Sequence, residues 1–226
     1  MGQTNSRISL STILPALVFI AGLDGLYLAG DWQLRAFIEV NIFLWTILMV
    51  LFPLLVLLKR RTSLRELGFH SASTGVWRSP GLLYLSGATV GIVWRFCDLL
   101  TSSQLPQAST GWSKQPTLAT FLNGLIVIPL VEETFFRGFL QTGLKTKIGS
   151  RWAIVLQAIL FAFHPGHLAQ DGFHGALFVL FGLMAGLAYD KTKSIYPLLA
   201  AHGVANVLPD LFHLLNEWWW TTDWVI

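Results

Sequence analysis

The sequence LATFLNGLIVIPLVEETFFRGFLQTGL, residues 118–144, combines a long apolar run with three charged residues, Glu132, Glu133 and Arg137. About 20 mostly apolar residues suffice for an α-helix to cross the hydrocarbon core of a bilayer. An ionisable side chain inside that core costs about 2.5–3.5 kcal/mol on insertion scales, and such residues usually face a bundle interior and carry function. The stretch therefore predicts a transmembrane helix that contributes ionisable groups to an internal site.

The composition of the whole chain is typical of a membrane protein. Of its 226 residues 54% are hydrophobic and 12% are charged, whereas a soluble domain carries about 25% charged residues. Much of the surface must therefore face lipid. The single cysteine, Cys97, excludes an intrachain disulfide framework and a cysteine metal cluster. Nucleic acid is not expected as a partner, because the sequence has no run of basic residues interleaved with aromatic residues.

Apolar segments of sufficient length recur along the chain, about seven in all. We expect an all-α fold, a polytopic transmembrane helix bundle that forms a single integral membrane domain over residues 1–226. Within it, Pro129 is expected to kink the fourth span and to open backbone carbonyls toward a cavity. Gly182 and Gly186 form a GxxxG pair, which permits close packing of helices. The predicted spans are Ile8–Ala29, Ala36–Leu58, Pro80–Leu100, Leu118–Leu144, Trp152–His164, Phe173–Tyr189 and Ile195–Leu215.

The distribution of lysine and arginine predicts the orientation, because these residues accumulate in cytoplasmic loops. With the N-terminus in the cytoplasm, eleven of them lie on the cytoplasmic side and two, Arg35 and Lys114, lie on the other side. We therefore expect a cytoplasmic N-terminus and a C-terminal tail, after Asn216, on the opposite side. The polar connector 59–79 then lies in the cytoplasm, with a surface helix expected near Leu64–Phe69.

The ionisable residues of the fourth span differ in the partners that a helix gives them. Glu133 and Arg137 are four residues apart and can pair on one helix face. Glu132 points about 100° away from Glu133 on an ideal helix, so it can face a cavity while its neighbour is held by the arginine. The same residues could instead form a buried ion pair that only stabilises the bundle.

Two further spans bring polar groups to a similar depth. His202 and Asn206 are again four residues apart, and the fifth span ends near His164 and His167. At a rise of about 1.5 Å per residue from each cytoplasmic end, Glu132 lies roughly 17 Å deep, His164 roughly 20 Å and His202 roughly 10 Å. One shared cavity is compatible with these depths. A carboxylate, imidazoles and an amide are the groups needed to activate water and to stabilise an oxyanion.

These residues resemble the motifs of the CPBP family, also called the Abi or CAAX-protease-like family. The family includes the eukaryotic type II CAAX prenyl endopeptidases and many bacterial membrane proteins. Its first motif, EExxxR followed by Gly, reads Glu132-Glu133-Thr-Phe-Phe-Arg137-Gly138 here. Its third motif, HxxxN, reads His202-Gly-Val-Ala-Asn206. The resemblance covers residues 118–210, which we expect to form the protease core.

The second motif of the family, FxxxH, departs from the usual pattern. Counted from Phe161, a histidine arrives one residue early, at His164; counted from Phe163, the spacing is right and the histidine is His167. The end of the apolar run favours His164, and the spacing favours His167. We rank His164 slightly ahead and keep both as candidates.

The resemblance implies an intramembrane glutamate-dependent endopeptidase that uses no metal or other cofactor. If the family's residue roles apply here, Glu132 activates the hydrolytic water with help from the histidine of the second motif. His202 and Asn206 stabilise the oxyanion, and Glu133 and Arg137 position these groups. The sequence itself lacks an HExxH zinc pair and a GxSxG elbow.

The expected substrate is a membrane-associated protein or peptide, in the eukaryotic case a prenylated CAAX protein. The compact length is typical of a bacterial member, so we expect a multi-pass protein of the inner (plasma) membrane. Two alternatives stay open. One is a non-catalytic scaffold or bacteriocin-immunity protein of the same fold, and the other is a proton-coupled transporter, since Glu and His clusters in membranes also relay protons.

The charge asymmetry gives a testable orientation. On a Cys97→Ser background, single cysteines placed in the connectors 59–79 and 145–151 should react in intact cells only with a membrane-permeant maleimide. Trp220→Cys should react with an impermeant reagent, because the tail lies outside. Protection of Trp220→Cys together with labelling of both connectors would invert the orientation.

Overall fold

Helices are the only regular elements in the part of the chain that the structure describes, which confirms the expected all-α class. Three helical stretches within that part are long and apolar enough to cross a membrane: Leu10–Ala29, Leu118–Ala162 and Gly175–Thr192. The third predicted span, Pro80–Leu100, lies outside the described residues, and the total of seven spans stays a prediction. The structure, a computed structural model, describes residues 8–40, 42–71, 118–164, 167 and 172–221.

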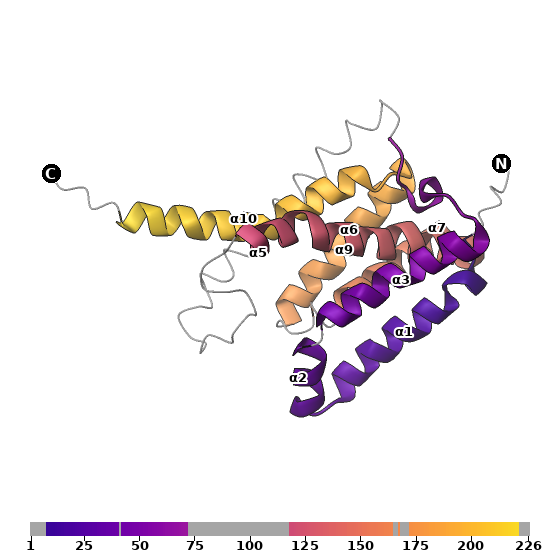
Figure 1. The fold of residues 1–226 in the computed structure, drawn as a ribbon, viewed down its shortest axis with the longest axis horizontal. Helices are drawn as coiled ribbons and strands as arrows, with labels where there is room; N and C mark the ends of the chain where they lie inside the picture. The colour runs from indigo at the N-terminus through magenta and orange to yellow at the C-terminus, as the bar shows by residue number, and fades with distance from the viewer. Residues whose placement is uncertain (1–7, 41, 72–117, 165–166, 168–171, 222–226) are drawn as a thin grey trace.

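The predicted second span, Ala36–Leu58, overlaps two helices, α2 and α3, which lie on either side of residue 41 (Figure 1), so its extent stays a prediction. The short helix α2 begins where the Asp31 carboxylate accepts a hydrogen bond from the Leu34 backbone N–H at 2.9 Å, as in a helix N-cap. Leu34 and Ile38, four residues apart, then pack against α1. Leu34 and Ile38 therefore attach α2 to α1. The bounds are α1 Leu10–Ala29, α2 Trp32–Val40 and α3 Ile42–Arg60.

The fourth and fifth predicted spans are helical runs that meet at a sharp break at Gly149. Its backbone there has φ 76° and ψ 168°, a conformation that glycine adopts far more easily than other residues. Two segments of the stretch, η3 and η4, are π-helices, in which hydrogen bonds run from i to i+5 and which often mark functional sites. The bounds are α5 Leu118–Leu122, η3 Asn123–Val127, α6 Ile128–Glu132, η4 Glu133–Gln141 and α7 Thr142–Ala162.

The GxxxG pair lies where α9, Gly172–Thr192, packs against α7. A Cβ on Gly182 would stand only 2.9 Å from the Ala158 Cα, so the absence of a side chain is what allows this approach. Two buried glutamines use the exposed backbone: Gln157 Nε2 donates to the Gly182 carbonyl at 2.8 Å and Gln141 Nε2 to that of Gly186 at 2.9 Å. The expected close packing is confirmed.

The connector after α3 forms a short helix where one was expected; Leu64 at its start is exposed, while Leu67 at its end docks into the bundle. Leu64–Leu67 forms a 3₁₀-helix, η1, whose Leu67 is buried, and the Leu67 carbonyl lies directly against Gly138 of η4. Gly68 follows with φ 91°, and its carbonyl accepts the Ile195 backbone N–H at 3.0 Å. The connector thus joins η4 to the start of α10, Tyr196–Thr221.

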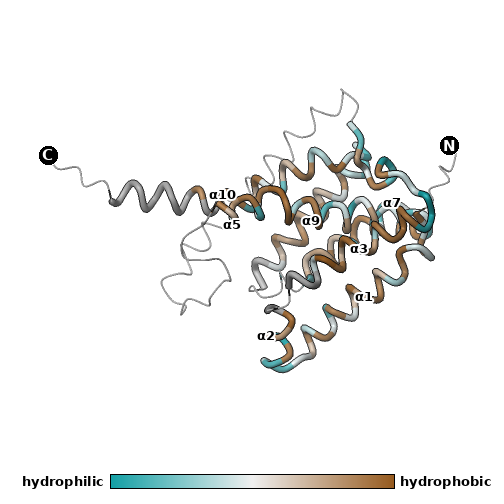
Figure 2. Tube along the Cα trace, viewed as in Figure 1, coloured by the Kyte–Doolittle hydropathy of each residue, from teal (hydrophilic) through white to brown (hydrophobic). Residues whose placement is uncertain are grey.

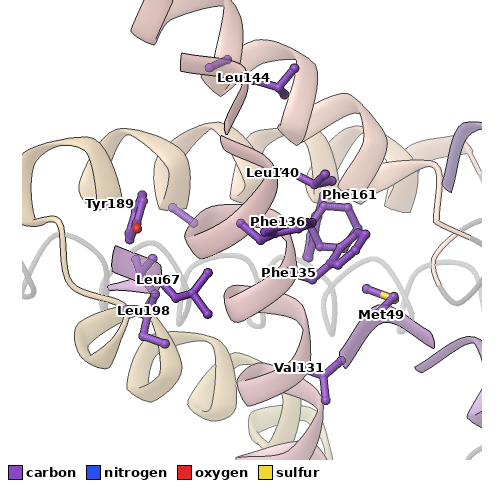
Figure 3. Packing of buried hydrophobic residues seen from close by; sticks show 14 of the residues in the cluster. Met49, Leu67, Val131, Phe135, Phe136, Leu140, Leu144, Phe161, Tyr189 and Leu198 are labelled. Carbon is purple, nitrogen blue, oxygen red and sulfur yellow. The ribbon is translucent and has the colours of Figure 1, made fainter. Parts of the chain in front are cut away.

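Phenylalanines of η4 form the centre of the core, where α1, α3, α7 and η1 meet. Figure 3 shows Phe135 and Phe136 pointing to Phe161 of α7, with Leu67 and Met49 on either side. Along the outer helix faces many large apolar side chains are exposed. Figure 2 shows hydrophilic residues gathered near the turn between α1 and α2 and around the far ends of α3 and α7. This distribution suits helices that cross lipid from one polar face to another.

Close packing at Gly182 predicts the effect of a single added methyl group. Gly182→Ala should lower Tm in detergent by about 2–12 °C, since overpacking costs about 1–3 kcal/mol and 1 kcal/mol corresponds to about 2–4 °C in a chain of this size. Gly175→Ala is the matched control in the same helix, because a Cβ there meets nothing within 4 Å. It should leave Tm unchanged or raise it. Equal Tm for both variants would contradict the packing assigned to Gly182.

Candidate active site

Glu133 and Arg137 form the predicted ion pair within η4. Arg137 Nη1 lies 2.9 Å from Glu133 Oε1, and neither side chain has any exposed surface. The guanidinium also lies over the ring of Phe161, 4.4 Å from its centroid, in a cation–π contact. A buried charge is tolerated only when it is paired, so each member of this pair requires the other.

His202 of α10 donates to the same carboxylate oxygen. Its Nδ1 is 2.8 Å from Glu133 Oε1, which therefore accepts from both Arg137 and His202. This hydrogen bond orients the ring so that the other ring nitrogen, Nε2, faces Glu132, 3.6 Å from its Oε2. Glu133 thus fixes the orientation of an imidazole that faces the second carboxylate.

His167 approaches Glu132 as a second imidazole. Its Nδ1 donates to the Phe161 carbonyl at 2.6 Å, which fixes the tautomer and leaves Nε2 as the nitrogen toward Glu132, 3.8 Å from Oε2. The ring stacks on Phe178 with centroids 3.9 Å apart and planes at 17°. A separation of 3.8 Å is too long for a direct hydrogen bond, and one water molecule can bridge the two atoms.

The two motif-two candidates occupy different environments. His164 is buried with its ring edge-on to Phe136, and its centroid is 5.7 Å from that of His167. His167 is the one whose Nε2 faces Glu132. The geometry therefore favours His167, although the position of His164 at the end of the apolar run had favoured the other. Phe161, which supplies the accepting carbonyl for His167, is also buried, whereas Phe163 is largely exposed.

Asn206 lies one turn beyond His202 on α10 and is half-buried. Its Nδ2 donates to the Gly124 carbonyl of η3 at 3.1 Å. The helices can approach this closely because Gly203 has no side chain, and a Cβ there would collide with the Leu125 carbonyl. Asn206 is thereby held to the helix that carries the glutamates.

Aromatic residues that the sequence analysis did not select form the wall of the site. Phe161 contacts Arg137, His167 and His202, and Phe181 lies 5.0 Å from the His202 ring centroid. The sequence did point to Phe161, because it is one of the two phenylalanines from which the FxxxH spacing was counted, but the motif was used only to locate the histidine. Its position beside two imidazoles and a guanidinium indicates that it also excludes water from them.

The cluster joins carboxylates, imidazoles and an amide in an apolar surrounding. Glu132 is at the contact point, since its Oε2 lies between the Nε2 atoms of His167 and His202. Among the described residues, no group of three His, Cys, Asp or Glu side chains is arranged to hold a metal ion. The arrangement can take a proton from a water molecule and offer donors to an oxygen that gains negative charge.

Comparison with known proteins gives one family. Residues 114–208 match the family model described as type II CAAX prenyl endopeptidase Rce1-like. No curated protein and no solved structure matches the chain. The matched segment includes the elements from α5 to the first half of α10, and with them every candidate residue of the site.

The shared carboxylate oxygen predicts unequal stability effects for the two glutamates. Glu133→Gln removes the charge that Arg137 requires, and breaking a buried pair in this way costs about 3–5 kcal/mol. A large loss of thermal stability in detergent is therefore expected. Glu132→Gln, an identical chemical change one residue away, should leave Tm nearly unchanged because Glu132 has no direct ion-pair partner within hydrogen-bond distance. A larger loss for Glu132→Gln would reverse this assignment.

Proposed function

Because residues 114–208 belong to the Rce1-like family of type II CAAX prenyl endopeptidases, we propose that this protein is an intramembrane endopeptidase with a glutamate as its general base. The observation that carries the proposal is the position of Glu132 Oε2 between two imidazole nitrogens, 3.8 Å from His167 and 3.6 Å from His202. The expected reaction is hydrolysis of a peptide bond in a membrane-associated protein or peptide.

Glu132 and His167 together make a site for the nucleophilic water. The bond of His167 Nδ1 with the Phe161 carbonyl leaves a lone pair on Nε2, and a carboxylate oxygen is also an acceptor. Two acceptors 3.8 Å apart do not bond to each other, whereas one water molecule can donate a proton to each. Such a water is oriented with its own lone pair outward, toward a substrate carbonyl carbon.

His202 and Asn206 are placed to stabilise the oxyanion. His202 Nε2 faces Glu132, 3.6 Å from Oε2, and it is a donor when the imidazole carries both protons. Asn206 carries a second N–H besides the one that Gly124 accepts. Donors held in place before the reaction contribute strongly to acyl transfer.

Water and the peptide bond are the only reactants that this hydrolysis consumes. The water oxygen forms a bond to the carbonyl carbon while Glu132 takes a proton, and the carbonyl oxygen becomes the oxyanion that His202 and Asn206 face. When the C–N bond breaks, the proton held by Glu132 passes to the leaving nitrogen. The products are a carboxylic acid and an amine, and Glu132 is again a carboxylate. Glu133 and Arg137 hold His202 throughout.

The location of the site supports a substrate that resides in or on the membrane. The catalytic elements belong to the long apolar stretch Leu118–Ala162 and to α10, and the outer faces of these helices expose leucines, valines and isoleucines. We propose a multi-pass protein of a bacterial inner membrane, and a substrate whose cleavage site lies near a lipid-anchored or transmembrane segment.

Loss of the general base should abolish turnover. Glu132→Gln is expected to reduce kcat by at least about 10²–10⁴-fold, because an amide cannot take a proton from water, while Tm stays near that of the wild type. The measurement is cleavage of an internally quenched peptide with a prenylated CAAX-type C-terminus, by purified protein in detergent with EDTA present. Wild-type rates for Glu132→Gln would refute the role, and activity that appears only on addition of Zn²⁺ would refute the metal-free mechanism.

The two neighbouring histidines supply a matched control for the same assay. His167→Gln should lose most of its kcat, since its Nε2 is the second acceptor for the water, whereas His164→Gln should retain most of it. The opposite pattern would make His164 the motif-two histidine.

A further inference from the structure

Pro129 interrupts the helix that carries the glutamates in a way that affects α10. In η3 the hydrogen bonds run from i to i+5, and the Ile128 N–H donates to the Asn123 carbonyl. The next donor in this register would be residue 129, with Gly124 as its acceptor. Proline has no N–H, so this partner is missing for Gly124, and the alternative i−4 partner is missing for Leu125.

Both of these carbonyls face α10, which packs against η3 and α6 (Figure 1). The Gly124 carbonyl accepts Asn206 Nδ2 at 3.1 Å. The Leu125 carbonyl lies directly against Gly203, three residues earlier in α10. Gly124 and Pro129 are themselves buried. A buried carbonyl without a donor is costly, so Asn206 replaces the backbone N–H that Pro129 cannot provide.

We infer that Pro129 is a positioning residue for the Asn206 amide, an inference that rests on the proposed function for its catalytic consequence. The Gly124 carbonyl takes one N–H of the amide and fixes its plane, so the second N–H has a single direction in which to donate. Asn206 and His202 share one face of α10, and His202 faces Glu132. Pro129 thereby sets the geometry of an oxyanion donor on another helix.

A double-mutant cycle on thermal stability tests the link without any substrate. In the wild type, Asn206→Ala leaves the Gly124 carbonyl buried without its donor and should lower Tm by about 2–12 °C. In Pro129→Ala, the restored N–H can bond to Gly124 or Leu125, so Asn206→Ala should lower Tm by less than half as much. Equal losses in the two backgrounds, which is the additive result, would overturn the inference.

Gln157→Ala is the matched control for this cycle. Gln157 Nε2 also donates to a buried backbone carbonyl, that of Gly182, at 2.8 Å, but neither residue adjoins Pro129. Its loss in Tm should be the same with and without Pro129→Ala. A reduced loss in the Pro129→Ala background would show that the proline acts on stability in general, and would also overturn the specific link.

The positioning role is tested by kinetics with the quenched prenylated peptide. Pro129→Ala should lower kcat by about 10–10²-fold with little change in KM, since a small misplacement of a catalytic donor has effects of this size, and its Tm should not fall. Unchanged kcat would overturn the positioning role. Pro15→Ala, a helix proline of α1, should leave kcat unchanged. If the wild type itself does not cleave, the proposed function fails while the stability cycle still decides the link between Pro129 and Asn206.

Discussion

The Glu133 Oε1 atom accepts hydrogen bonds from Arg137 and His202 in the middle of an apolar bundle. Charges can remain there only if they stay paired at short distance, so η4 and α10 must keep a fixed separation. Two glycines allow it: Gly203 admits a carbonyl of η3, and Gly138 admits the η1 connector behind η4. Much of the close packing around the site thus follows from one oxygen atom that needs two donors.

The contacts of Glu133 Oε1 also distinguish two adjacent, chemically identical side chains, Glu132 and Glu133. Glu133 is committed to Arg137 and His202 and has no surface exposed. Glu132 has imidazole nitrogens near it, at distances too long for direct hydrogen bonds. The difference lies in their partners, because both carboxylates come from the same helix. A π-helix begins between them, and irregular helical turns of this kind are frequent at functional sites.

Features that depend on spacing along one helix could be predicted from the sequence. The ion pair of Glu133 with Arg137 and the close approach at Gly182 follow from residues four positions apart. The choice between His164 and His167 could not, because it depends on where the chain turns after α7. The docking of Leu67 could not either, since a short polar connector carries no periodic signal of burial. Composition alone gave the membrane class, whereas the separate helix α2 depends on contacts with α1.

A pair formed within one helix exists before the rest of the protein has been synthesised. Ribosomes add the chain from its N-terminus, and His202 is synthesised 69 residues after Glu133. Glu133 and Arg137 can neutralise each other while the candidate span that begins at Leu118 is still at the translocon, where a lone buried charge disfavours insertion. His202 arrives afterwards and completes the network. Membrane insertion and the assembly of the candidate site therefore place the same demand on residues 133 and 137.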